Sequence, residues 1–159
     1  MRKIYPVAFN LLIGAEGHLS TDPKDPGNYY PDGSPGFTVW GLCTKFNDNL
    51  SKGMSLQEAM DRYYFKYWVP AGCENQGIDD QWAICLFDSQ VNPQNDPKLP
   101  GGGNQEIMNL KPENWQDYNI LRMQRYMRCS NPEYVKGHIF RVLRLSENIK
   151  RINANGVMV

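Results

Sequence analysis

The amino-acid sequence predicts a mainly α-helical domain with one or two short β-strands, and three observations carry this prediction. Apolar residues recur at three- and four-residue steps over several long stretches, which is the period of an α-helix. Only Phe37–Trp40, closed by Gly41, is typical of a strand. A chain of 159 residues can bury about 70% of the surface that it exposes when unfolded. One core is therefore sufficient, and we expect a single domain over residues 1–159.

The expected helices follow from apolar periodicity and from capping residues. The second helix is the clearest, because Ser55 and Glu58 have capping-box spacing and Pro70 ends it. The third is apolar on nearly all sides, which is typical of a helix in the centre of a bundle. In chain order, helices are expected at residues 6–15, 55–69, 79–92, 105–110, 112–129 and 132–150, with a loop at residues 20–36. The expected solvated face of the last helix carries Arg141, Arg144 and Lys150.

Charge and cysteine content exclude several classes of function. Lys+Arg and Asp+Glu are both 17, so the formal net charge is zero and a nucleic-acid binder is not expected. No apolar run approaches the ~20 residues that span a bilayer, so no membrane insertion is expected. None of the four cysteines forms a CxxC pair, which favours four free thiols over a zinc site or a redox motif. Residues 4–13 are interpreted as an amphipathic helix rather than an export signal, so we expect cytoplasmic synthesis.

Glu16 is the candidate catalytic acid. It follows the apolar residues of the first expected helix, where Gly17 is the candidate left-handed residue at the helix end. The helix dipole and the apolar neighbours both disfavour the charged carboxylate at this position, so the pKa of Glu16 is expected to be raised. A carboxylic acid that stays protonated near neutral pH can act as the general acid of glycosidic cleavage. The alternative is a surface glutamate at a fraying helix end.

A second carboxylate for the same chemistry is expected in the loop that follows. Asp25 lies nine residues after Glu16 in a turn-rich segment, where it would stay ionised and orient water or stabilise positive charge on a sugar. Asp22 and Asp32 are alternatives for this role. Each of these aspartates also fits a plain turn, since each precedes Pro or Gly.

Five segments, taken together, resemble glycoside hydrolase family 108, whose members are phage and bacterial N-acetylmuramidases with a lysozyme-like fold. Residues 16–27 resemble the family opening, which reads Glu-Gly-Gly-Tyr and then Asp-Pro-x-Asp-x-Gly-Gly-x-Thr. Residues 38–42 are similar to its Thr-x-x-Gly-Ile, and residues 64–68 to its Tyr-x-x-Tyr-Trp. Residues 87–92 resemble Phe-Asp-x-Ala-Val-Asn, and residues 136–142 resemble a late Gly-Trp-x-x-Arg-Val. Their order and spacing hold from about residue 7 to residue 143.

The resemblance implies a lysozyme-like, mainly α domain with a small β-hairpin or short strands near the active-site cleft. It also implies Glu16 as the catalytic acid, with Asp25 or Thr38 orienting the attacking water. Thr38 departs from the family spacing, because the twelve residues from Pro26 to Phe37 separate it from Asp25 where the family has only a few. We interpret these twelve residues as a loop insertion at the edge of the cleft.

Four further residues are candidate substrate contacts. Trp40 fits either a position beside Glu16 or under a sugar ring, or plain core packing. Asn92 fits either recognition of an acetamido group or a cap at the end of its helix. Tyr29 and Tyr30 have no obvious core to fill, so they are expected to contact glycan or to shield the acid from water. Two histidines are not assigned a metal: His18 is expected in the loop near the acid, and His138 on a helix face.

The resemblance therefore implies hydrolysis of the β-1,4 bond between N-acetylmuramic acid and N-acetylglucosamine in peptidoglycan, without cofactor or metal. A lytic transglycosylase that uses Glu16 alone and a non-catalytic wall-binding virion module are the alternatives. An endolysin of this kind would be a monomer, made in the cytoplasm of the bacterial host. Its partners would be glycan strands, and a separate holin-like protein would release it to the cell wall in the periplasm.

Overall fold

The chain forms two compact units in the computed structural model, which describes residues 1–14, 18–93, 103–129 and 132–152. The helical unit comprises Met1–Leu11 and Tyr64–Val159, and the sheet unit comprises Leu12–Tyr63. The division therefore lies inside the first helix and after Tyr63, and not in the proline- and glycine-rich segment at residues 93–103. That the two units act as one domain remains a prediction.

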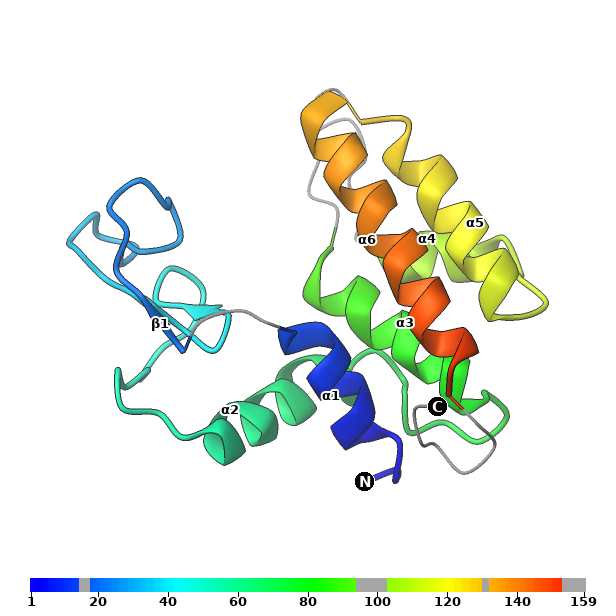
Figure 1. The fold of residues 1–159 in the computed structure, drawn as a ribbon, viewed down its shortest axis with the longest axis horizontal. Helices are drawn as coiled ribbons and strands as arrows, with labels where there is room; N and C mark the ends of the chain where they lie inside the picture. Colours follow the sequence, from blue (N-terminus) through cyan, green and yellow to red (C-terminus); the bar gives the residue numbers. More distant parts are fainter. Residues whose placement is uncertain (15–17, 94–102, 130–131, 153–159) are drawn as a thin grey trace. The chain divides into compact units, whose positions relative to one another are not determined.

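The described chain is mainly helical, with a small sheet, which confirms the predicted fold class (Figure 1). In chain order the elements are α1 (Tyr5–Ile13), β1 (Leu19–Ser20), β2 (Thr38–Val39), β3 (Leu42–Cys43), α2 (Leu56–Tyr63), the π-helix η1 (Tyr64–Trp68), α3 (Asp80–Val91), α4 (Gly103–Asn109), α5 (Trp115–Tyr126) and α6 (Pro132–Lys150). None of the helices among the described residues is long and apolar enough to cross a membrane.

The sheet is antiparallel, in the order β1-β2-β3, and is one strand larger than predicted. Trp40 and Gly41 join β2 to β3, and both have positive φ angles, of 49° and 75°. Two successive left-handed residues form the tight turn that matches the twist of a hairpin, which explains the glycine after Trp40. The strands contain two residues each, so they are too short for alternation of polar and apolar residues to reveal them.

Helix α3 lies at the centre of the helical unit, as its apolar sequence predicts. It contacts η1, α4, α5 and α6, and its residues from Ala83 to Ser89 are all buried. The Asp79 side chain caps its first turn by accepting a hydrogen bond of 2.7 Å from the Trp82 N–H. Figure 1 shows α5 and α6 running side by side within this unit, and the two helices pack on each other.

The N-terminal residues complete the core of the helical unit. The ring of Tyr5 lies 4.9 Å from that of Trp68 and 5.7 Å from that of Phe87, in edge-to-face arrangements. The guanidinium of Arg2 donates to the carbonyls of Cys73 and Ile78, both at 3.1 Å. Arg2 and Tyr5 are therefore held by residues that follow them in the chain by more than sixty positions.

A buried ion cluster lies beside α3 and was not predicted. The side chain of Asp88 is 5% exposed, and it accepts from Arg122 Nη2 at 2.8 Å and from Arg141 Nη2 at 2.7 Å. Burial works to raise the pKa of Asp88, but the two guanidinium groups outweigh it and the pKa is lowered. The prediction of a solvated Arg141 is wrong, because this side chain turns inward to the buried carboxylate; Arg144 and Lys150 are exposed, as expected.

Helix α2 begins as predicted and then changes period. The capping box is present: Ser55 N–H donates to Glu58 Oε2 at 2.8 Å, and Glu58 N–H donates to Ser55 Oγ at 3.2 Å. After Tyr63 the chain continues as the five-residue π-helix η1, which takes more residues per turn than an α-helix. A single apolar face with a 3.6-residue period over residues 55–69 is therefore not formed, and Leu56 is exposed.

Helix ends differ from the predicted ones by a few residues. Helix α1 ends at Ile13, and Gly14 is left-handed with φ of +54°. Gly17, the predicted left-handed residue, and Ala15, the predicted last helical one, lie outside the described residues. Helix α5 begins later than predicted, because Asn114 caps it by accepting from the Asp117 N–H at 2.9 Å.

Candidate active site

Thr38 occupies the central strand of the sheet and carries a buried hydroxyl. Its neighbours across the sheet are Ser20 on β1 and Cys43 on β3. Within the part of the chain that the structure describes, the Thr38 Oγ1 atom is buried and has no hydrogen-bond partner. Nearly all buried polar groups in proteins are hydrogen-bonded, so a lone buried hydroxyl is a candidate for a functional role.

The turn that carries Asp25 adjoins both neighbours of Thr38. Asp25 is exposed, and its Oδ1 accepts from the Gly27 N–H at 2.8 Å. A Cβ built on Gly27 would lie 3.2 Å from Cys43 Cβ, so this turn packs against β3. The next residue, Asn28, is buried and donates through Nδ2 to Ser20 Oγ at 3.2 Å. The sheet unit therefore brings the turn of Asp25 and the strand of Thr38 together.

The rest of the loop is fitted closely to the same strands. Gly36 N–H donates to the Asn28 carbonyl at 2.9 Å, and Phe37 N–H donates to Thr44 Oγ1 at 3.1 Å. A Cβ at Gly36 would overlap Thr44 Oγ1, so only glycine fits there without a shift of its neighbours.

Trp40 is half-buried and is held by its indole nitrogen. Nε1 donates to the Met54 carbonyl at 2.9 Å, and the His18 ring lies edge-on to the indole at 4.6 Å between centroids. His18 Nε2 lies 3.1 Å from the same carbonyl oxygen. Trp40 was expected either beside Glu16 or under a sugar ring, or packed in the core. Its side chain is half-buried and is held in one orientation by the hydrogen bond of its indole nitrogen. The pairing of His18 with Trp40 was not predicted, because it depends on the distant Met54 carbonyl.

Tyr29 and Tyr30 border a groove of the inserted loop, with a volume of about 440 Å³. Lys24, Lys45, three prolines and a glycine complete its lining. The Tyr29 hydroxyl donates to the Pro23 carbonyl at 2.9 Å, and Tyr30 is 41% exposed. The expectation that the two tyrosines lack a core to fill agrees with their positions on this groove.

Asn92 lies in the helical unit and caps the end of α3. Its Nδ2 donates to the Asp88 carbonyl at 3.1 Å, and its backbone N–H donates to the same carbonyl at 3.0 Å. Of the two roles left open for Asn92, the cap is therefore present. Among the described residues, none donates a hydrogen bond to the Asn92 Oδ1 atom.

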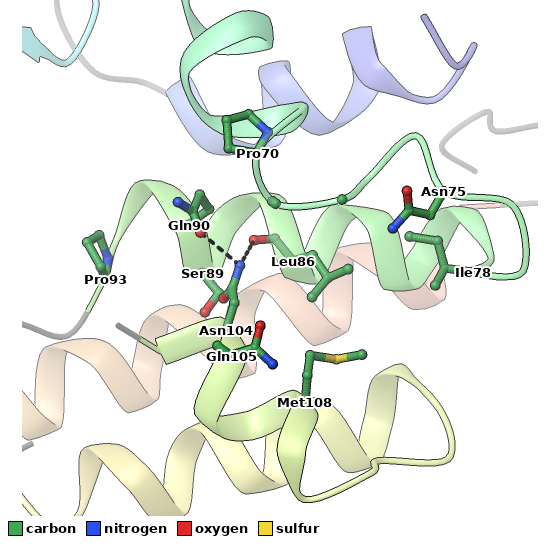
Figure 2. Close-up of a pocket in the computed structure, with 12 residues that line it drawn as sticks. Pro70, Asn75, Ile78, Leu86, Ser89, Gln90, Pro93, Asn104, Gln105 and Met108 are labelled. Atoms are coloured by element: carbon green, nitrogen blue, oxygen red, sulfur yellow. Dashed lines mark hydrogen bonds between the residues drawn. The ribbon is translucent and has the colours of Figure 1, made fainter. Parts of the chain in front are cut away.

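A second pocket, of about 540 Å³, lies in the helical unit among α3, α4 and the residues after η1 (Figure 2). Its lining is uncharged and includes four side-chain amides. Figure 2 shows Asn104 at its centre, where Nδ2 donates to the Leu86 carbonyl and to Gln90 Oε1 at 3.1 and 3.2 Å. Asn104 Oδ1 accepts from the Tyr118 hydroxyl at 2.7 Å, so this amide fixes the wall of the pocket. The pocket was not predicted, because its residues come from segments that only the fold brings together.

Two predicted features complete the description of the site. Glu16, the candidate acid, lies outside the described residues. His138 lies on α6 with its ring 4.0 Å from that of Tyr134, and its pKa is lowered by burial and by the two arginines of the ion cluster. Over the described ranges, no three His, Cys, Asp or Glu side chains gather closely enough to hold a metal ion.

The comparison with protein families decides the class of the chain. The family model described as glycosyl hydrolase 108 matches residues 9–93, which is more than half of the sequence. The chain belongs to the glycosyl hydrolase 108 family. Comparisons with curated proteins and with solved structures gave no match.

Membership of glycosyl hydrolase 108 confirms the predicted enzyme class, a glycoside hydrolase. The matched region contains Glu16, Asp25, Thr38 and the loop between them, and it ends at Pro93, just after α3. The resemblance at residues 136–142 lies beyond the match. In the glycosyl hydrolase, Arg141 of that segment binds Asp88 of the segment at residues 87–92, so two of the five similar segments meet in the ion cluster.

Proposed function

We propose that the chain is an N-acetylmuramidase of the endolysin type. It hydrolyses the β-1,4 bond between N-acetylmuramic acid and N-acetylglucosamine in bacterial peptidoglycan. Membership of the glycosyl hydrolase family supports the reaction class. The observation that carries the site is the buried Thr38 hydroxyl, which has no hydrogen-bond partner among the described residues and lies beside the turn of Asp25.

In the proposed reaction, Glu16 is the general acid. It donates a proton to the glycosidic oxygen as the bond from that oxygen to the anomeric carbon of N-acetylmuramic acid breaks. Water adds to the anomeric carbon, oriented by the Asp25 carboxylate or by the Thr38 hydroxyl. The proton that the water loses passes to a carboxylate, Asp25 or the ionised Glu16. The products are a reducing N-acetylmuramic acid end and a free hydroxyl on N-acetylglucosamine.

Substrate contacts are proposed for three aromatic residues of the sheet unit and, separately, for one amide of the helical unit. Trp40 offers an indole face whose orientation is set by its bond to the Met54 carbonyl. Tyr29 and Tyr30 offer a second aromatic surface on the groove of the loop. Asn92 keeps Oδ1 for an acetamido N–H. We place the activity at the cell wall of a bacterial host, after release from the cytoplasm with the help of a holin-like protein.

The acid is tested with Glu16→Gln, which keeps the shape of the side chain but cannot donate the proton. General acid catalysis contributes about 10²–10⁴ in rate, so lysis of permeabilised cells should fall by that factor. The melting temperature should be unchanged. Glu113→Gln is the matched control, because this exposed glutamate precedes α5 in the helical unit. An active Glu16→Gln protein of normal stability would refute the assignment.

The role of Thr38 is tested with Thr38→Val and Thr38→Ser. Valine keeps the branched shape and removes a hydroxyl that no described residue hydrogen-bonds, so stability should hold or rise. Loss of one hydrogen bond to water should slow hydrolysis about 2- to 10-fold, while serine keeps most of the rate. Equal rates for all three proteins would remove Thr38 from the mechanism.

The reaction products distinguish hydrolysis from the lytic transglycosylase reaction, which would use the same acid. Mass spectrometry of digested peptidoglycan should show reducing N-acetylmuramic acid ends. A product set dominated by 1,6-anhydro ends would identify a lytic transglycosylase instead.

A further inference from the structure

The groove of the inserted loop carries two lysines that the proposed reaction does not use. Lys24 and Lys45 line it together with Tyr29 and Tyr30, and no acidic side chain is in the lining. Both lysines are exposed. Among the described residues, neither ammonium group makes an ion pair. The groove therefore combines aromatic faces with unpaired positive charge.

The aspartates of the same loop are held by the backbone of their own turns. Asp22 Oδ1 accepts from the Lys24 N–H at 2.9 Å, and Asp25 Oδ1 accepts from the Gly27 N–H at 2.8 Å. Asp32 Oδ1 accepts from the N–H of Ser34 at 2.9 Å and from its hydroxyl at 2.7 Å. Each carboxylate therefore has one oxygen directed into its own turn, and among the described residues none of the three forms an ion pair with Lys24 or Lys45.

The shape of the groove is fixed before any ligand binds. The Tyr29 hydroxyl is bonded to the Pro23 carbonyl, and Tyr29 forms a β-bridge with Pro35. Tyr30 N–H donates to the Ser34 carbonyl at 2.9 Å. Because these hydrogen bonds and the prolines already restrict the loop, ordering it on binding costs little conformational entropy.

We propose that this groove binds the carboxylates of the stem peptides that peptidoglycan carries on its muramic acid. The inference rests on the proposed function and adds a preference for peptidoglycan whose stem peptides carry carboxylates. The ammonium groups of Lys24 and Lys45 take the carboxylates, and the tyrosine faces take the apolar parts of the peptide. A volume of about 440 Å³ lies in the range of sites for small ligands, which suits a short peptide. Glycans without carboxylates gain nothing from the lysines.

The experiment compares two forms of insoluble peptidoglycan from which wall phosphate polymers have been removed with hydrofluoric acid. One form keeps its carboxylates, and the other is amidated with carbodiimide and ammonium. Binding is measured by cosedimentation after a short incubation, and the hydrolysis rate is measured on the same material. The variants are Lys24→Ala/Lys45→Ala and the control Lys52→Ala. Lys52 is a matched control, because its Nζ lies 5.6 Å above the Phe37 ring, as Lys45 Nζ lies 5.7 Å above the Phe46 ring.

The wild type should bind the carboxylate form more tightly, and the double variant should lose this preference. An exposed ion pair changes affinity about 1.5- to 5-fold, so two lysines together give about 2- to 25-fold. The effect should appear in KM and not in kcat, and Lys52→Ala should behave as the wild type. Equal binding of both forms by the wild type, or an unchanged preference in the double variant, overturns the inference. Absence of hydrolysis by the wild type contradicts the proposed function instead, and cosedimentation still tests the groove.

Discussion

Replacement of Asp88 by asparagine should be among the most damaging single substitutions in the helical unit. The carboxylate is almost completely buried and binds two guanidinium groups, one of which, Arg122, is itself 1% exposed. Asp88→Asn leaves Arg122 as a buried charge without its counter-ion, and breaking a buried pair in this way costs about 3–5 kcal/mol. For a protein of this size, the melting temperature should fall by about 6–20 °C.

The assay is urea and thermal unfolding followed by circular dichroism, with Asp80→Asn as the matched control. Asp80 lies on the same helix and pairs with Arg2, but its side chain is 43% exposed, so its loss should cost at most about 1 kcal/mol. If Asp88→Asn destabilises the protein no more than Asp80→Asn does, the reasoning about burial is wrong.

Comparison of the wild type with Asp88→Asn also predicts how the stability contributed by the ion cluster changes with pH. The pKa of Asp88 is lowered from its ordinary 3.8 in the folded protein. The ion cluster therefore contributes its full stability above about pH 4 and loses it as the pH falls through the folded pKa. The difference in unfolding free energy between wild type and Asp88→Asn should be constant from pH 5 to 7 and shrink in stronger acid. A difference that grows in acid would contradict the assigned direction.

Three further outcomes are expected. Ser55→Ala removes the hydroxyl that accepts from the Glu58 N–H, while the backbone N–H of residue 55 can still donate to the Glu58 carboxylate. The change should cost about 1 kcal/mol in unfolding free energy, measured by urea titration; no loss would mean that the cap does not form in solution. Gly36→Ala should lower the melting temperature, because its Cβ overlaps the Thr44 hydroxyl. Gly137→Ala, in open space on α6, should leave the melting temperature unchanged or raise it. The reverse order would contradict the close fit of the loop. Burial raises the pKa of Cys73 to about 12 and also raises that of Cys85, so a thiol reagent at pH 8 should label these two cysteines only on unfolding; rapid labelling of the native protein would show that they are accessible.

Helices with caps could be predicted from the sequence, because the responsible residues lie within one or two turns of each other. Ser55 caps α2, as its spacing from Glu58 predicted, and Asp79, where the third helix was expected to begin, caps α3. The pairing of β1 with β2 could not be predicted from the sequence, because strands of two residues contain no repeat. The change from α2 to η1 was missed for a related reason, since a five-residue π-helix breaks the period on which the prediction depends.

The candidate site shows the same limit. Asp25 could be selected by residue type and spacing, and Thr38 by the resemblance of its segment to the family motif. The contact of the turn with Cys43 could not be predicted, because it depends on the pairing of β2 with β3. Asp88 was overlooked although a lone carboxylate in an apolar helix needs a buried partner. Its partners lie 34 and 53 positions away, at distances in the chain where no periodicity points to them.

The helical unit is built from two separate segments of the chain, residues 1–11 and 64–159, and this affects how it folds during translation. The ring of Tyr5 packs on Phe87, so 82 further residues must be synthesised before this contact can form. At about 5–20 residues per second, the ribosome takes about 4–16 s over that stretch. During this interval the sheet unit can fold from contiguous residues, while the first helix presents its apolar side chains to the cell. Chaperone binding and early aggregation should therefore concentrate on nascent chains that end before α3.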